Sequence, residues 1–122
     1  MKKIETVTII GLGALGMLYG KSMTDALGYE NVRFCMNRDR YEKYKDVKYS
    51  VCGEEVSFNM VPSDEAEVTD LVLVAVKYPG LESAIEDMRA CVGEDTVIMS
   101  VLNGISSEDM IARAYGASHM IN

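Results

Sequence analysis

The sequence lacks the features that mark membrane, nucleic-acid-binding and secreted proteins. No apolar run is long enough to span a bilayer, which argues against a membrane protein. There is no run of Lys and Arg, and the net charge of −7 argues against a nucleic-acid-binding surface. The start, Met1-Lys2-Lys3, is basic, but no signal-peptide core or cleavage site follows it. We therefore expect a cytoplasmic protein.

Cysteine and histidine are scarce. The three cysteines, Cys35, Cys52 and Cys91, are widely spaced and lack the C-x-x-C spacing of zinc and redox motifs. The single histidine, His119, has no partner at metal-ligand spacing. We predict three reduced thiols and no metal site.

Length and composition are those of an ordinary globular domain. The 122 residues are 48% hydrophobic and 25% charged, without an internal repeat or a low-complexity tract. A chain of this length forms one domain or part of a larger one.

The most informative segment is a β-branched run that meets a glycine fingerprint. Residues 4–10 predict a buried strand, and the sequence Gly-Leu-Gly-Ala-Leu-Gly follows at 11–16. A helix-compatible stretch then runs from Ala14 to about Leu27. The glycine pattern alone is a weak signal, but a strand, these glycines and a helix in this order are typical of a dinucleotide-binding βαβ unit. A glycine-rich turn without a ligand is the alternative.

Each glycine of the fingerprint has an expected role. Gly11 permits the tight turn out of the strand, and Gly16 lets the helix pack close to the sheet. Gly13 has no Cβ, so the backbone can approach a pyrophosphate. The N–H groups of the first helical turn then face the anion.

Strands and helices alternate along most of the remaining chain. Segment 70–76 is apolar on both faces, as is typical of a central strand in a parallel sheet. We expect an α/β fold of the Rossmann type: a doubly wound, mainly parallel sheet with helices on both faces. The expected strands are 4–10, 31–36, 70–76 and 96–102, with a small hairpin or strand pair from 49–52 and 55–60 and a last strand beginning within 117–122. The expected helices are 14–27, a short one within 37–48, 81–92 and about 106–115, with one helical turn in the connector 62–67. The first helix has an apolar stripe formed by Leu15, Leu18, Tyr19, Met23, Ala26 and Leu27.

Four strand ends carry candidate site residues. Gly11, Asn37, Lys77 and Asn103 each follow an expected strand, and ligands bind at the carboxyl ends of such strands. Lys77 is the one plausible cationic acid among them; a surface lysine that covers a strand end is its alternative reading. Asn103 starts an Asn-Gly pair that also suits a plain turn before a helix.

The residues after the second strand bear on the choice of nucleotide. An Asp or Glu usually holds the ribose hydroxyls of NAD at this position, but the sequence reads Asn37-Arg38. Arg38 offers a planar cation for a 2′-phosphate, and Arg40 could assist. These residues favour NADP, whereas Asp39 could instead reach the ribose.

These motifs together resemble the amino-terminal domain of the ketopantoate reductases, also called 2-dehydropantoate 2-reductases. The resemblance rests on Gly-Ala-Leu-Gly in the fingerprint, Asn37-Arg38, Val76-Lys77 and Asn103-Gly104. It implies NADPH-dependent reduction of 2-dehydropantoate to pantoate for coenzyme A biosynthesis. It also implies a role for each of the following residues: Gly11, Leu12, Gly13, Ala14, Leu15 and Gly16 at the pyrophosphate, Asn37 and Arg38 at the adenosine ribose, and Lys77 and Asn103 beside the nicotinamide and the substrate as catalytic candidates.

The chain departs from the family in length. The family has a second, helical domain that supplies a general-acid lysine and a substrate-binding glutamate, and neither belongs to these 122 residues. We therefore expect residues 1–122 to be a cofactor-binding domain, incomplete at its C-terminus, with negligible turnover on a small 2-keto acid. An incomplete domain exposes apolar surface, so we also expect a homodimer or other self-association. The alternatives are a non-catalytic NADP(H)-binding module and a reductase of a related 2-keto acid.

Overall fold

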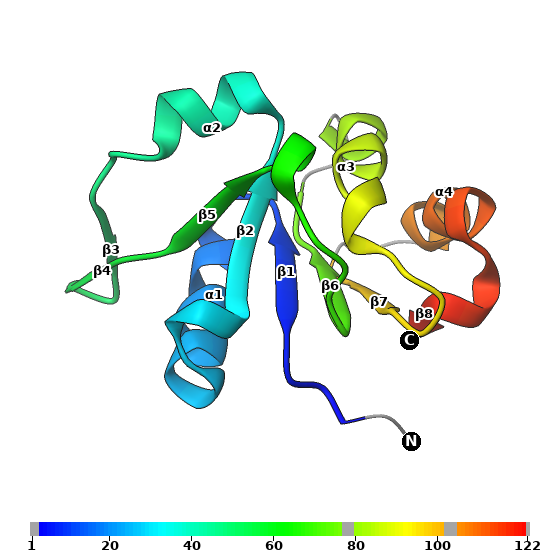
Figure 1. Cartoon of the computed structure of the whole chain (residues 1–122), viewed down its shortest axis with the longest axis horizontal. Coiled ribbons are helices and arrows are strands. Elements are labelled where there is room, and N and C mark those ends of the chain that lie inside the picture. Colours follow the sequence, from blue (N-terminus) through cyan, green and yellow to red (C-terminus); the bar gives the residue numbers. More distant parts are fainter. Residues whose placement is uncertain (1–2, 77–79, 102–104, 122) are drawn as a thin grey trace.

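The fold is a parallel sheet that carries helices on both faces (Figure 1). The computed structural model describes residues 3–76, 80–101 and 105–121. Six strands pair in the order β5-β2-β1-β6-β7-β8, and every neighbouring pair is parallel. The strands are β1 Val7–Ile10, β2 Val32–Met36, β5 Asn59–Pro62, β6 Leu71–Val74, β7 Val97–Ser100 and β8 Met120–Ile121. The predicted fold class is confirmed.

The helices follow the strands in alternation. They are α1 Ala14–Leu27, α2 Arg38–Tyr44, α3 Leu81–Asp87 and α4 Ile105–Tyr115. Short 3₁₀ turns occur at Tyr29–Asn31, Ser63–Glu65, Arg89–Cys91 and Ala117–His119. Within the described ranges, no helix has the length and apolar character needed to cross a membrane.

Two cores lie on opposite faces of the sheet, because alternate residues of each strand point to opposite sides. On β6, Leu71 and Leu73 join the core that contains Met23 and Leu27 of α1. Val72 and Val74 join the core that α3 and α4 cover through residues such as Leu81 and Ile111. Burial on both faces explains why the 70–76 segment is apolar throughout.

The strand order reverses beside β1. The chain runs from β1 to β2 and β5 on one side, and from β6 to β7 and β8 on the other. The carboxyl ends of β1 and β6 stay together, with Ile10 opposite Val74 and the Ala75 amide donating to the Ile10 carbonyl at 2.7 Å. In an open α/β sheet this reversal opens a crevice, which places a ligand site at the turns after β1 and β6.

A separate antiparallel hairpin lies between α2 and β5. Its strands are β3 Tyr49–Val51 and β4 Glu54–Val56, joined through Cys52 and Gly53 with φ of 53° and 82°. The predicted hairpin is confirmed, but the expected second arm at 55–60 is not one strand. It divides into β4 and the edge strand β5, which pairs with β2 in the main sheet.

Two expectations for the helices are corrected. The predicted helix 81–92 ends at Asp87 and continues as the 3₁₀ turn Arg89–Cys91. The predicted apolar stripe of α1 is largely solvent-exposed at its start, where Leu15 is 52% and Leu18 46% exposed. The buried positions of α1 are instead Gly16 and Gly20. A Cβ at Gly20 would lie 2.6 Å from the Phe34 ring, so the helix packs on the sheet through its glycines.

Candidate functional site

A cleft of about 540 Å³ lies at the carboxyl edge of the sheet. The turn between β1 and α1 forms one side, and the segments after β6 and β7 form another. Its described lining residues are Gly11, Leu12, Gly13, Ala14, Leu15, Arg40, Tyr44, Tyr49, Ala75, Val76, Gly80 and Val101. The glycine turn therefore opens onto the crevice that the strand order creates.

Two fingerprint glycines are required by close backbone contacts. Gly11 has a φ of 115°, and a Cβ there would lie 2.7 Å from the carbonyl of Ala75. A Cβ at Gly16 would lie 2.0 Å from the carbonyl oxygen of Gly11. Both distances are far below van der Waals contact, so any side chain would force β1, α1 and the segment after β6 apart.

Gly13 differs from the other two glycines, because nothing lies within 4 Å of a Cβ built on it. Its φ of −87° and ψ of −172° are open to any residue. Gly13 is the N-cap of α1, which has no side-chain cap and no acidic residue in its first turn. The first-turn amides of α1 thus present partial positive charge to an open space, as a pyrophosphate site requires.

Arg38 does not reach this cleft. Its Nε lies 3.0 Å from Asp64 Oδ2, and its Nη2 bonds to both Asp64 and Glu65. Hydrogen bonds to these carboxylates raise the pKa of Arg38 further, and Arg38 in turn lowers the pKa of Asp64. The guanidinium expected to meet a 2′-phosphate is already paired with these two carboxylates and, at 3.5 Å, with that of Glu42.

Asn37 acts as the N-cap of α2. Its Oδ1 accepts a hydrogen bond from the Arg40 amide at 2.9 Å, so the side chain fixes the start of the helix. Asn37 does not line the cleft; instead the helix it caps brings Arg40 and Tyr44 there. These two residues are four apart and share one helix face, a spacing visible in the sequence. Tyr49 lies at the start of β3 and also lines the cleft. Its place there depends on the fold of the hairpin and cannot be read from the sequence.

Lys77 and Asn103 lie outside the described residues, so their roles remain predictions. Their described neighbours Val76, Gly80 and Val101 line the cleft. All three cysteines are free, with Cys35 and Cys91 buried and Cys52 exposed. In the described portion of the chain, no group of three or more His, Cys, Asp or Glu side chains is arranged to hold a metal ion.

Acid is expected to destabilise the fold by protonating the carboxylates of the Arg38 cluster. This cluster consists of Arg38, Glu42, Asp64 and Glu65. Arg38 lowers the pKa of Asp64, and Lys45 and Arg38 lower that of Glu42. A carboxyl whose pKa is lower in the folded state stabilises the fold above its unfolded-state pKa, and this is lost as the pH falls through the folded value. The urea concentration at the midpoint of unfolding should therefore decrease as the pH is lowered from about 5 to about 2.5.

Arg38→Gln is the matched control for this acid effect. It removes the cation, so the fall in midpoint should be smaller than in the wild type. Because these groups are exposed, high salt should also reduce the fall. An unchanged pH profile in Arg38→Gln would show that the cluster contributes nothing.

The chain is similar to a family of known proteins over nearly all of its length. The family model described as "Ketopantoate reductase PanE/ApbA" matches residues 7–122. The 2-dehydropantoate 2-reductase of Aquifex aeolicus is 30% identical, over 93% of this chain and 36% of its own. That of Streptococcus pyogenes serotype M1 is 28% identical, over 94% of this chain and 38% of its own. The chain thus spans less than two fifths of the length of these relatives.

Solved structures of other proteins have the same fold as this chain. A 2-dehydropantoate 2-reductase from Geobacter metallireducens superposes with a TM-score of 0.75 and 27% identity, over 94% of this chain and 39% of its own. D-mandelate dehydrogenase, solved with NADH and anilino(oxo)acetate, superposes with a TM-score of 0.75 and 24% identity, over the same shares.

Proposed function

The chain belongs to the ketopantoate reductase PanE/ApbA family, and from that premise we propose that it is the dinucleotide-binding part of an NADPH-dependent 2-dehydropantoate 2-reductase. One observation carries the proposal: the uncapped start of α1, with open space at Gly13, faces a cleft of about 540 Å³. Residues 1–122 form this part, and the helical substrate-binding part of the family lies outside them. We also propose that the protein is cytoplasmic.

The fingerprint residues would hold the pyrophosphate through main-chain amides. Gly13 leaves room for the anion, and Leu12, Ala14 and Leu15 line the same cleft. The bound cofactor would supply a hydride to the keto carbon of the substrate. From the family resemblance, Lys77 would lie near the nicotinamide and the substrate, with its Nζ as a hydrogen-bond donor, and Asn103 would bind the nicotinamide ribose. The general-acid lysine that the resemblance implies belongs to the second domain.

We also propose that the chain prefers NADPH to NADH. Asn37 replaces the acidic residue that usually binds the ribose of NAD. No Asp or Glu is among the described residues that line the cleft, so a 2′-phosphate would meet no carboxylate on those walls. NADH bound to D-mandelate dehydrogenase shows that this fold also accepts the other dinucleotide.

The substrate is tested on the product of the complete reading frame that carries this chain. With NADPH and 2-dehydropantoate, we expect cofactor oxidation and formation of pantoate, which mass spectrometry identifies. Other branched 2-keto acids, run in parallel, test the alternative of a related reductase. Residues 1–122 alone should bind NADPH with negligible turnover, because the substrate-binding part is absent.

Two outcomes would contradict this proposal. Cofactor binding by the complete product without reduction of any 2-keto acid would favour the non-catalytic NADP(H)-binding module. Rapid turnover by residues 1–122 alone would show that the second domain is not needed and that Lys77 suffices as the acid.

Self-association is expected from the exposed apolar start of α1. Leu15, Leu18 and Tyr19 are 52%, 46% and 38% exposed and are spaced to lie on one helix face. A ketopantoate reductase of this fold from Staphylococcus aureus is described as dimeric. Sedimentation of the 122-residue chain should show dimers or larger species, and Leu18→Glu should shift them toward the monomer. A wild-type chain that stays monomeric at high concentration would contradict this expectation.

A further inference from the structure

Three residues from α2 and β3 line part of the cleft. Arg40 and Tyr44 come from one face of α2, and Tyr49 comes from β3. The Tyr49 hydroxyl donates to the Tyr44 carbonyl at 3.3 Å, which joins the hairpin to the end of the helix. Two tyrosines and one arginine therefore line the same cleft as the glycine turn.

Arg40 is the single charged residue among the described residues that line the cleft. In the part of the chain that the structure describes, its guanidinium belongs to no ion pair within 4.0 Å, whereas Arg38 pairs with Asp64, Glu65 and Glu42. Arg40 lowers the pKa of Asp87, but burial outweighs this effect and leaves that pKa above its ordinary value. Arg40 is thus better placed than Arg38 to receive a new anion.

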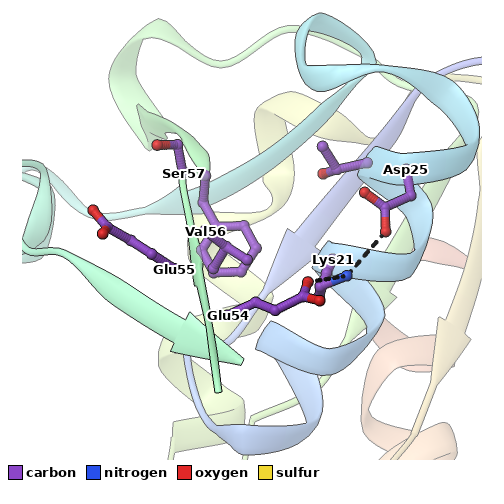
Figure 2. A pocket seen from close by; sticks show the side chains of 8 residues that line it. Lys21, Asp25, Glu54, Glu55, Val56 and Ser57 are labelled. Carbon is purple, nitrogen blue, oxygen red and sulfur yellow. Dashed lines mark hydrogen bonds and ion pairs between the residues drawn. The ribbon is translucent and has the colours of Figure 1, made fainter. Parts of the chain in front are cut away.

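The hairpin that carries Tyr49 is held against α1. Figure 2 shows Lys21 of α1 between Asp25 and Glu54. Lys21 Nζ lies 3.1 Å from Asp25 Oδ2 and 3.3 Å from Glu54 Oε2 of β4. The centroid of the Tyr49 ring also lies 5.8 Å from that of Phe58, and the Phe58 ring in turn contacts Phe34 of β2. Tyr49 is therefore positioned by contacts with the body of the domain.

We propose that Arg40, Tyr44 and Tyr49 form the subsite for the adenosine end of the dinucleotide, and that Arg40 rather than Arg38 selects a 2′-phosphate. This inference rests on the proposed dinucleotide binding. The tyrosine rings supply the apolar, aromatic surface that an adenine base packs against. The guanidinium supplies paired N–H donors that suit a phosphate.

Two nucleotides without nicotinamide test this subsite by calorimetry: adenosine 2′,5′-bisphosphate and adenosine 5′-diphosphate. Arg40→Gln should weaken the bisphosphate by about 10- to 100-fold, as expected for a lost charged hydrogen bond. The same variant should change the affinity for the 5′-diphosphate by less than about threefold, since that nucleotide lacks the 2′-phosphate. Arg38→Gln is the matched control and should change either affinity by less than about threefold.

A second pair of variants tests the aromatic wall. Tyr49→Ala should weaken both nucleotides by about 5- to 100-fold, because base–aromatic stacking is lost. Tyr49→Phe keeps the ring and should bind both nearly as the wild type does. Tyr29→Ala, at an exposed tyrosine that does not line the cleft, controls for general loss of an aromatic residue.

The outcomes distinguish a failure of the Arg40 and Tyr49 assignments from a failure of the proposed dinucleotide binding. A folded wild-type chain that binds neither these nucleotides nor NADPH would overturn the proposed function itself. A wild type that binds the bisphosphate, with Arg40→Gln unchanged or with the loss arising in Arg38→Gln, would overturn the Arg40 assignment alone. Equal binding by Tyr49→Ala and the wild type would remove Tyr49 from the subsite.

Discussion

Replacing Gly13 with valine is expected to abolish dinucleotide binding and to leave the fold in place. The backbone at Gly13 is in the extended region, and no protein atom lies within 4 Å of a built Cβ. The fold therefore tolerates a side chain here, and the weaker N-cap should cost about 1 kcal/mol. The valine methyl groups would occupy the space through which a pyrophosphate approaches the first turn of α1. We expect a loss of roughly 100-fold or more in NADPH affinity.

Fluorescence titration with NADPH and urea unfolding measure these two effects separately. Gly13→Ala is the graded control, because its single methyl group fills less of the space and should weaken binding less. Undiminished binding by a folded Gly13→Val chain would mean that the anion does not approach this turn.

Gly16→Ala should act in the opposite way, by destabilising the fold itself. The new Cβ would lie 2.0 Å from the carbonyl oxygen of Gly11, a backbone atom that cannot rotate aside. The start of α1 would have to move away from β1, which would also disturb the contact of Gly20 with Phe34. Overpacking of this kind costs about 3 kcal/mol or more when the backbone must shift.

Chemical denaturation of the same set of variants measures this effect. Gly13→Ala lies less than one turn away and should lower the free energy of unfolding by about 1 kcal/mol or less. The comparison separates a steric requirement from a general cost of replacing glycine. A Gly16→Ala protein as stable as Gly13→Ala would contradict the close helix–sheet packing.

Much of the fold could be predicted from local sequence signals. The bounds of α1 were recoverable because Gly13 precedes the helix and Gly28, with a φ of 98°, ends it. The parallel sheet was recoverable because β6 is apolar on both faces. The exposure of Leu15 and Leu18 was not recoverable, because periodicity reports apolar side chains, whereas the fully buried positions of α1 are Gly16 and Gly20. Met23 and Leu27 are only partly buried against the core.

The candidate site was predictable in part for the same physical reasons. The glycine turn and the end of β6 meet because parallel strands end at one edge, a rule that needs only the strand order. The state of Arg38 was not predictable, since its partners Asp64 and Glu65 are distant in sequence and meet it only in the folded chain. Tyr49 was missed because the hairpin pairs apart from the main sheet.

Dinucleotide binding by the turn between β1 and α1 is measured by calorimetric titration of the wild-type 122-residue chain with NADPH. We predict saturable binding of one NADPH per chain that adenosine 2′,5′-bisphosphate displaces. A chain that unfolds cooperatively, and is therefore folded, yet takes up no dinucleotide would contradict it.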